Sequence, residues 1–158
     1  MTNYLGGDRV EEYGYITTLQ QFGMMTHQLF HSLTRQMANL PVSAEAPILL
    51  HVIEKHGPLT QKDIARRMRI KPATLTVRLQ RLEKLEYVKR ETDVNDKRIQ
   101  KVSITDDGVR IIKECYEAFG YVAKHAFDGF SEDEVKTFIS SIQRMNENIE
   151  KIDMKGKE

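Results

Sequence analysis

Apolar residues recur at steps of three and four near the beginning of the chain. This stripe consists of Ile16, Leu19, Phe22, Leu29, Leu33 and Met37. Because an α-helix has about 3.6 residues per turn, such steps place side chains on one face of a helix. The pattern therefore predicts a long first helix that starts at Ile16, contains Gly23 and ends before Pro41.

Two further stripes with the same steps close the chain. The first consists of Val109, Ile112, Tyr116, Phe119, Ala123 and Ala126. The second consists of Val135, Phe138, Ile142, Met145, Ile149 and Ile152. Thr105 can cap the first of these helices, and Ser131 with Glu134 forms a capping box for the second. A pair of amphipathic helices is predicted.

Three shorter helices are predicted between these long ones. The first begins near Ala44 and stops at Gly57. The next has Thr60 as its N-cap, with Asp63 as an acidic partner three residues further on. The third opens at Pro72, which a first helical turn tolerates, and its buried stripe is Leu75, Leu79, Leu82 and Leu85. The last two helices, joined by a tight turn, form a helix-turn-helix.

A β-hairpin is predicted directly after the helix-turn-helix. The segments Tyr87 to Arg90 and Ile99 to Ile104 suit strands, and Asp93 to Asp96 supplies turn residues between them. The predicted fold class is mostly α with a small β-hairpin wing, that is, a winged helix-turn-helix flanked by long helices.

Basic charge is concentrated on this winged segment. The chain as a whole carries 24 Lys and Arg residues against 23 Asp and Glu residues, a net charge of +1. Between Thr60 and Lys101, however, 13 basic residues stand against 6 acidic ones. The balance of the whole chain excludes a uniformly basic chromatin-type protein, while the local excess predicts a polyanionic partner.

Composition restricts the remaining classes of protein. The 158 residues, 40% hydrophobic and 30% charged, suit one compact domain or a domain with an appendage. The longest apolar run, Ala46 to Leu50, is far shorter than the roughly 20 residues that cross a bilayer. The acidic amino terminus and the single Cys115 predict a cytoplasmic protein without an intramolecular disulfide. With no catalytic motif evident, neither an enzyme nor a cofactor is expected.

The second helix of the helix-turn-helix is predicted to enter the major groove of DNA. Its outward face carries small and polar side chains, which suit base edges, thymine methyl groups and phosphates. These candidates are Ala73, Thr74, Thr76, Val77, Arg78, Gln80 and Arg81, with Lys71 directly before them. A basic helix that is only the solvated face of an ordinary domain is the alternative, and the coincidence of charge with motif disfavours it.

The chain resembles the MarR family of bacterial transcriptional regulators over nearly all of its length. The most specific stretch is RETDVNDKR, Arg90 to Arg98, followed by VSITDDG, which ends at Gly108. This stretch is similar to the family pattern R-x-x-D-x-x-D-x-R and then L-T-x-x-G, with Ile104 in place of leucine. The segment Gly57 to Ala65 is also similar to the family's first helix-turn-helix segment.

The resemblance implies roles for the residues of the wing. Arg98 is expected to enter the minor groove, and Asp96 to support the wing by pairing with an arginine. Arg90 and Lys97 are expected near phosphates. Two other roles stay open, because Asp96 can simply shape the turn and Arg90 can brace the fold through an ion pair.

Two residues depart from the family pattern. Members often carry arginine at the position of Val77, so this chain is expected to prefer a different operator. Glu86 stands where the family usually has a glycine, which argues against a left-handed helix cap there.

The long terminal helices predict a symmetric homodimer. Their stripes supply more apolar surface than the domain between them can cover, and the resemblance implies the same assembly. A monomer in which these helices pack on each other is the alternative. The predicted organisation is a dimerisation helix in residues 1–40, a DNA-binding domain in residues 41–105 and dimerisation helices in residues 106–158.

A cleft for small phenolic or aromatic acids is a further implication of the resemblance. The residues expected near this cleft are His27, Phe30, His31 and His51. Although His27 and His31 share a helix face, no second ligand cluster accompanies them, so no metal site is predicted. Cys115 lies beside an apolar stripe and is interpreted as a packing residue.

The function predicted from these observations is sequence-specific binding of double-stranded DNA by a homodimeric transcriptional regulator. A repressor that acts on a pseudo-palindromic operator and is released by a small amphipathic ligand is expected. The alternative is a winged-helix module that binds protein, whose binding should be largely independent of salt.

Overall fold

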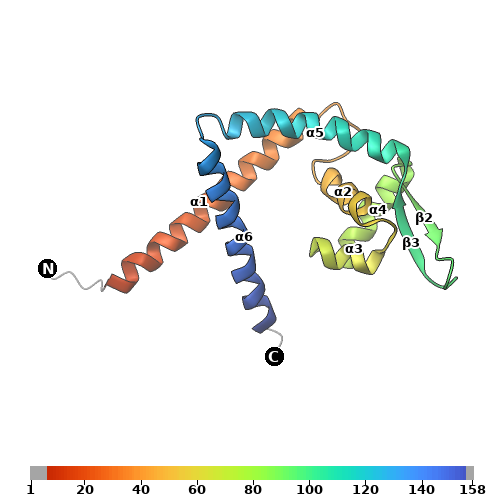
Figure 1. The fold of residues 1–158 in the computed structure, drawn as a ribbon, viewed down its shortest axis with the longest axis horizontal. Coiled ribbons are helices and arrows are strands. Elements are labelled where there is room, and N and C mark those ends of the chain that lie inside the picture. The colour runs from red at the N-terminus through yellow and green to blue at the C-terminus, as the bar shows by residue number, and fades with distance from the viewer. Residues whose placement is uncertain (1–6, 156–158) are drawn as a thin grey trace. The chain divides into compact units, whose positions relative to one another are not determined.

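The computed structural model describes the backbone of residues 7–155 and the side chains of residues 14–152. The elements are α1 (Gly7–Gln36), α2 (Ala46–His56), β1 (Leu59–Thr60), α3 (Gln61–Met68), α4 (Pro72–Lys84), β2 (Val88–Thr92), β3 (Gln100–Ile104), α5 (Asp106–Ala126) and α6 (Glu132–Lys155) (Figure 1). The predicted class, mostly α with a small β wing, is confirmed. Helix α1 is continuous through Gly23 and begins nine residues before the predicted start.

The chain divides into two compact units. The first ends at Val122 and contains the helix-turn-helix and the sheet, and the second begins at Ala123 and contains α6. Within the second unit, the capping box predicted at the start of α6 is confirmed. The Ser131 hydroxyl accepts from the Glu134 amide at 3.3 Å, and the Glu134 carboxylate accepts from the Ser131 amide at 2.8 Å.

Local side-chain bonds fix the start of the helix-turn-helix. The Thr60 hydroxyl accepts from the amide of Asp63 at 3.1 Å and donates to the Asp63 carboxylate at 2.6 Å. The hydrogen bond from Thr60 lowers the pKa of Asp63, and the positive charge of Arg66 adds a smaller effect in the same direction. A carboxylate in the first turn also suits the positive end of the helix dipole. The predicted N-cap of α3 is therefore confirmed.

Helix α4 ends in a left-handed cap, so the expectation that Glu86 would prevent one is wrong. Glu86 has φ of +60°. Its amide donates to the carbonyl of Glu83 at 3.0 Å, and the amide of Tyr87 donates to the carbonyl of Leu82 at 3.0 Å. These two bonds make a Schellman motif, which satisfies helix-end carbonyls that would otherwise lack partners. The bonds hold the left-handed conformation in spite of the steric cost of a side chain there.

Three antiparallel strands form the sheet, in the order β1-β3-β2. Arg90 of β2 is opposite Val102 of β3, and Leu59 of β1 is opposite the other side of Val102. The hairpin was predicted, but β2 runs further along the chain than expected, to Thr92. Strand β1 was not predicted, because two residues are too short to produce an alternating pattern. The hairpin of β2 and β3 extends away from the start of α5 (Figure 1).

A continuous core joins α2, α4, the sheet and α5. Its fully covered side chains include Leu49, Leu50, Ile53, Ile64, Leu75, Leu79, Val102 and Cys115. Burial raises the pKa of the Cys115 thiol to about 11, so this thiol stays protonated at neutral pH and acts as a packing group.

The core of this chain covers a face of α5 that coincides only in part with the predicted apolar stripe. The buried residues are Gly108, Ile111, Ile112, Cys115 and Val122, whereas Tyr116 and Ala123 are exposed. The helix carries apolar residues on two adjacent faces, and the core takes the face that includes the cysteine. Gly108 has a separate reason to be small, because a Cβ there would collide with the carbonyl oxygen of Tyr87. This close approach explains the glycine in the motif that follows β3.

Candidate nucleic-acid interface

Helix α4 presents a nearly continuous exposed face. The three leucines Leu75, Leu79 and Leu82 are buried on the opposite side. Of the predicted groove-facing residues, five are exposed: Ala73, Thr74, Val77, Gln80 and Arg81. Lys71 is also exposed and stands at the N-cap position. Val77, which is 67% exposed, makes an apolar spot between polar neighbours.

Thr76 differs from these residues because it is half-buried and bonded within the protein. Its hydroxyl donates to the carbonyl of Pro72 at 2.9 Å and accepts from the side-chain amide of Gln61, the first residue of α3. The sequence did not point to Gln61. The contact ties the beginning of α3 to the first turns of α4 and so fixes the angle between these two helices.

Arg78 is also withdrawn from the exposed face. Its Nη2 atom lies 2.6 Å from Oε2 of Glu45, the residue directly before α2. Only 28% of the Arg78 side chain is exposed. The sequence did not indicate Glu45, since the pair joins two segments that are far apart along the chain.

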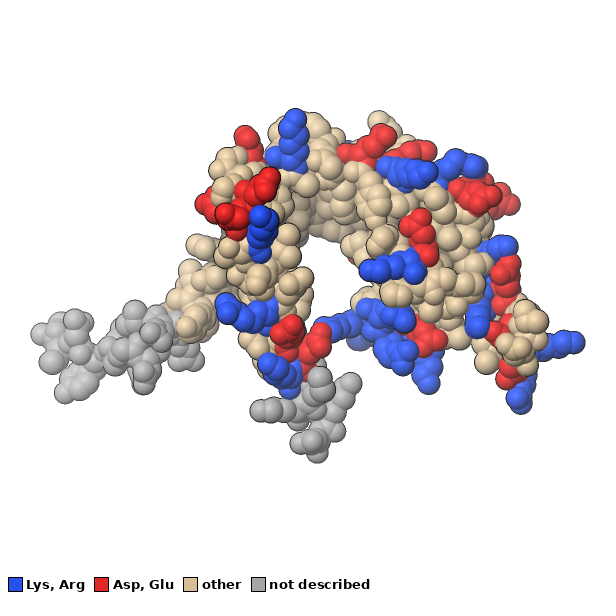
Figure 2. Space-filling model, in the orientation of Figure 1, with Lys and Arg blue, Asp and Glu red and all other residues tan. Residues whose placement is uncertain are grey.

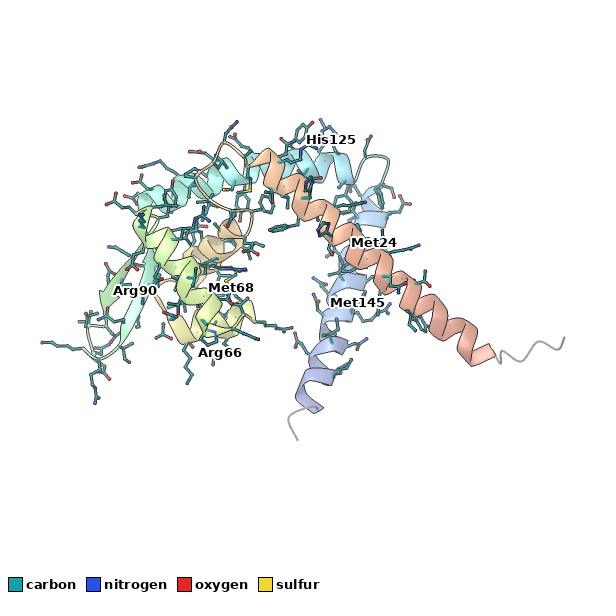
Figure 3. All side chains as sticks on the ribbon, turned by 180° about the vertical axis from the view of Figure 1, so that it is seen from behind. Met24, Arg66, Met68, Arg90, His125 and Met145 are labelled. Atoms are coloured by element: carbon teal, nitrogen blue, oxygen red, sulfur yellow. The ribbon has the colours of Figure 1, made fainter. Side chains whose placement is uncertain are left out.

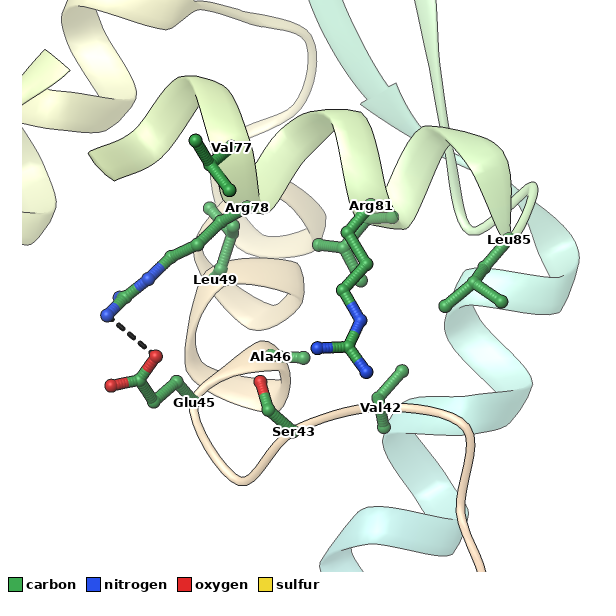
Figure 4. Close-up of a pocket in the computed structure, with 10 residues that line it drawn as sticks. Val42, Ser43, Glu45, Ala46, Leu49, Val77, Arg78, Arg81 and Leu85 are labelled. Carbon is green, nitrogen blue, oxygen red and sulfur yellow. Dashed lines mark ion pairs between the residues drawn. The ribbon is translucent and has the colours of Figure 1, made fainter. Parts of the chain in front are cut away.

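A small cavity of about 210 Å³ lies between α4 and the segment that leads into α2. Its walls are largely aliphatic and include Val42, Ala46 and Leu49. Figure 4 shows the guanidinium groups of Arg78 and Arg81 leaning over this cavity, the former towards Glu45 and the latter towards Ser43.

Arg90 has the bracing role that the sequence left open. It projects from β2 (Figure 3), and its Nε atom donates to Oε2 of Glu83 on α4 at 3.2 Å. The pair connects the end of α4 with β2, the first strand of the hairpin. Because both side chains are partly exposed, the contact orients the two elements more than it stabilises them.

Asp93 organises the turn at the tip of the hairpin, although the sequence indicated no role for it beyond that of a turn residue. Its carboxylate accepts from the amides of Asn95 at 2.9 Å and Asp96 at 3.0 Å, and it forms an ion pair with Lys101 of β3. The hydrogen bond from Lys101 is the main cause that lowers the pKa of Asp93 to about 2, and the two amides add to it. The turn is therefore built around an ionised carboxylate.

Asp96 and Arg98 lie next to each other in the same turn. The Asp96 carboxylate accepts from the Arg98 amide at 3.0 Å and from Arg98 Nε at 3.2 Å, which together lower the pKa of Asp96. Asp96 thus both shapes the turn and pairs with an arginine. The Arg98 side chain is nevertheless 92% exposed, and Lys97 is exposed beside it.

Lys and Arg side chains gather on the helix-turn-helix and at the tip of the hairpin (Figure 2). Each of the two places contains cations that are held by carboxylates and cations that project into solvent. Arg66, for example, pairs with Asp63 at 2.8 Å. The surface therefore offers a polyanion several contact points across α3, α4 and the wing.

The four residues predicted near an effector cleft do not line a common cavity within the described part of the chain. His27 borders a shallow surface depression on α1, with Gly23 and Met24. Phe30 borders another, at the end of α1. His31 is exposed, and His51 of α2 is exposed with its ring 6.2 Å from that of Tyr116, edge to face. No group of three or more potential metal ligands lies together among the residues that the structure describes.

Comparison with known proteins agrees with this geometry. A family model described as the MarR family matches residues 39–99. An uncharacterised HTH-type transcriptional regulator of Bacillus subtilis, YwhA, is 24% identical over 127 residues, which cover 74% of this chain and 91% of the relative.

Solved structures share the fold. A MarR protein from Peptoclostridium difficile superposes with a TM-score of 0.76 at 18% identity and covers 96% of this chain and 93% of its own. A mutant of MarR from E. coli, in complex with operator DNA, gives a TM-score of 0.75 at 22% identity and covers 84% of this chain and 95% of its own.

The matched residues 39–99 include α2, the helix-turn-helix, β2 and the turn that leads into β3. The wing motif, the helix-turn-helix geometry and the shared fold thus agree with one another. Residues 39–99 thus match the MarR family of transcriptional regulators, and the chain has the winged helix-turn-helix fold of solved MarR proteins.

Proposed function

We propose that this protein binds double-stranded DNA in a sequence-specific manner and regulates transcription, as a repressor. The observation that carries the proposal is the exposed face of α4, opposite its buried leucines, within the segment of strongest positive charge. A fold neighbour of this chain, E. coli MarR, has been solved in complex with operator DNA. Helix α4 enters the major groove, and the hairpin reaches along the backbone.

The exposed residues of α4 divide into two chemical groups. Thr74 and Gln80 can hydrogen-bond base edges, while Ala73 and Val77 can contact thymine methyl groups. Arg81 lies on the flank of the helix and supplies a charge for phosphate or guanine. Thr76 acts indirectly, by holding α4 against α3, because its hydroxyl is already bonded to Gln61 and Pro72.

The wing supplies the second contact. Arg98 projects from the tip of the hairpin and enters the minor groove, where negative potential is concentrated. The contact between Arg98 and Asp96 is exposed and therefore weak, so Arg98 readily exchanges it for a contact with DNA. Lys97 lies towards the phosphates, Asp96 supports the turn, and Arg90 holds the wing against α4 through its pair with Glu83.

The active form is a homodimer assembled through α1 and α6. Apolar side chains of α1, such as Tyr15, Leu19 and Met24, are more than half exposed, and so is Ile152 of α6. Covering these side chains with a second copy removes apolar surface from water. Two recognition helices about one helical turn apart then select a pseudo-palindrome of roughly 16 to 20 base pairs. Residues 1–40 and 106–158 serve dimerisation, and residues 41–105 bind DNA.

Binding to DNA is tested by selecting duplexes from a random pool and measuring the affinity of the selected site at two salt concentrations. Between about 50 and 200 mM salt, six to ten phosphate contacts should reduce the affinity by roughly 10³ to 10⁵. The proposal is contradicted if the protein enriches no duplex sequence or if its binding does not depend on salt concentration. Either result favours the protein-binding alternative.

Release by a small amphipathic anion is the regulatory part of the proposal. A ligand near His27, Phe30, His31 and His51 would favour one spacing of the two recognition helices over another. Coupling between such a ligand and DNA is expected to be about 1 to 3 kcal/mol. Titration of salicylate-like acids into the complex with the selected duplex measures it, and a broad panel without effect contradicts regulation by this class of ligand.

A further inference from the structure

The recognition helix carries one arginine that is engaged by the protein itself. Arg78 of α4 pairs with Glu45 at 2.6 Å, and the contact is shown as the dashed line in Figure 4. Glu45 stands at the N-cap position of α2, but its side chain makes no capping bond there. Its carboxylate is therefore directed to the arginine instead of to its own helix.

Arg81 provides a comparison on the same flank of α4. Because the two arginines are three residues apart, their side chains leave the helix on neighbouring positions. Arg81 is exposed and forms no ion pair within the described residues, whereas Arg78 is half-buried and paired. The exposed Val77 lies next to Arg78, which places Arg78 at the edge of the surface proposed to face DNA.

We infer that Glu45 withholds Arg78 from DNA and thereby sets how strongly the protein binds DNA of any sequence; this inference rests on the proposed DNA binding. A carboxylate at 2.6 Å occupies the place that a phosphate oxygen would take on the guanidinium. To reach a phosphate, Arg78 must leave Glu45 and expose that negative charge beside the DNA. Replacing the contact with Glu45 by a contact with phosphate therefore changes the free energy of DNA binding little. Arg78 thus adds little to the protein's attraction for phosphates.

This role matters for a regulator because affinity for random DNA is almost entirely electrostatic. A cation at the edge of the recognition helix would contact phosphates in every register. Masking it keeps the recognition surface from binding random sequence too tightly, while the exposed side chains of α4 remain available to read bases.

The test compares Glu45→Gln with a variant that changes the charge equally at a different place on α2. Glu54→Gln is that control, because Glu54 lies 3.6 Å from His51 of its own helix. Binding of a random-sequence duplex and of the selected site is measured by fluorescence anisotropy between about 50 and 200 mM salt. For each additional phosphate that the protein neutralises, the log-log salt slope should steepen by about 0.9, which is roughly a threefold greater loss of affinity over this range.

Glu45→Gln is expected to bind random DNA more tightly than the unchanged protein at low salt, with the steeper slope, and Glu54→Gln is expected to keep the original slope. The double variant Glu45→Gln/Arg78→Gln restores the original charge and should return the slope to its original value. A purely structural role of Glu45 would not move the salt slope. Circular dichroism establishes that each variant is folded.

The inference is overturned if Glu45→Gln keeps the original slope, if its affinity falls, or if Glu54→Gln steepens the slope equally. It is also overturned if the double variant retains the steeper slope, because the tighter binding would then not come from Arg78. If one of these results is obtained while the unchanged protein still binds DNA in a salt-dependent manner, the inference fails and the proposed function stands. If the unchanged protein binds no DNA, the proposed function itself fails.

Discussion

Helices α4 and α6 both carry apolar stripes with steps of three and four residues, but only the stripe of α4 is buried over most of its length. Leu75, Leu79 and Leu82 of α4 are at most 3% exposed. In α6, by contrast, Ile149 is 47% and Ile152 is 69% exposed. Spacing alone therefore identifies which face of a helix is apolar and not what covers it. The winged-helix part covers its own stripe, whereas the exposed end of the α6 stripe is left for the second copy of the proposed homodimer.

The largest effect is expected from a substitution in the buried leucine stripe of α4. Leu79→Ala should lower the free energy of unfolding by about 2 to 5 kcal/mol, because it leaves a cavity in a closely packed core. Denaturant titration at one protein concentration measures the change. Gln80→Ala, one residue along on the exposed face, is the matched control. Similar losses for the two variants would contradict the burial of the leucine stripe.

A substitution at the exposed end of the α6 stripe should weaken the proposed homodimer. Ile149→Asp would place an unpaired carboxylate in the proposed dimer interface and weaken association by about 2 to 4 kcal/mol per dimer. Light scattering after size-exclusion chromatography measures the masses over a range of concentrations. The control Asn146→Asp adds the same charge to an exposed polar position of α6. A dimer that is equally stable in both variants would show that α6 does not form the interface.

Within the winged-helix part, function can be separated from fold at the tip of the hairpin. Arg98→Ala should weaken binding of the selected duplex by about 1 to 3 kcal/mol per site, because a guanidinium is lost from the minor groove. Lys97→Ala should mainly lower the salt slope, by about one unit per phosphate contact. Fluorescence anisotropy distinguishes the two effects. Unchanged affinity in a folded, dimeric Arg98→Ala protein would contradict DNA contact by the wing.

The sequence predicted the features that depend on neighbours in the chain. The N-cap Thr60, the capping box at Ser131 and the leucine face of α4 follow from spacings of three and four residues, and all three were confirmed. The fold class followed from the order of these elements. Local chemistry of this kind is visible in a sequence because its partners lie within one helical turn.

The features that were missed depend on contacts between distant segments. Glu45 meets Arg78, and Gln61 meets Thr76, only after the helices have packed. No spacing rule indicates such pairs. The face of α5 that the core covers was not predicted for a related reason, since the helix has two adjacent apolar faces and the packing of the whole unit selects one. The candidate site could therefore be located from the sequence, but the engaged side chains within it could not.

A smaller effect is expected at the end of α4, where the covered helix stops. Glu86→Gly should raise the free energy of unfolding by about 1 kcal/mol, because glycine adopts the left-handed conformation without a steric penalty. The gain is reduced by the greater freedom of glycine in the unfolded chain. Denaturant titration measures it, and Gln80→Gly at an exposed position in the helix interior should have the opposite sign. Destabilisation by Glu86→Gly would show that the Glu86 side chain makes a compensating contact.

The smallest effect concerns pH and the turn of the wing. The pKa of Asp93 is lowered to about 2 in the folded protein, chiefly by Lys101. A lowered pKa means that ionised Asp93 stabilises the fold above its ordinary pKa of 3.8, and that this contribution is lost as the pH falls through about 2. The unchanged protein should therefore be more stable than Asp93→Asn at pH 5, and the difference should shrink as the pH approaches 2. Thermal unfolding of both proteins across this range measures it, and Lys101→Gln should show part of the same loss at pH 5. A difference that stays constant down to pH 2 would mean that Asp93 acts in the turn without its charge.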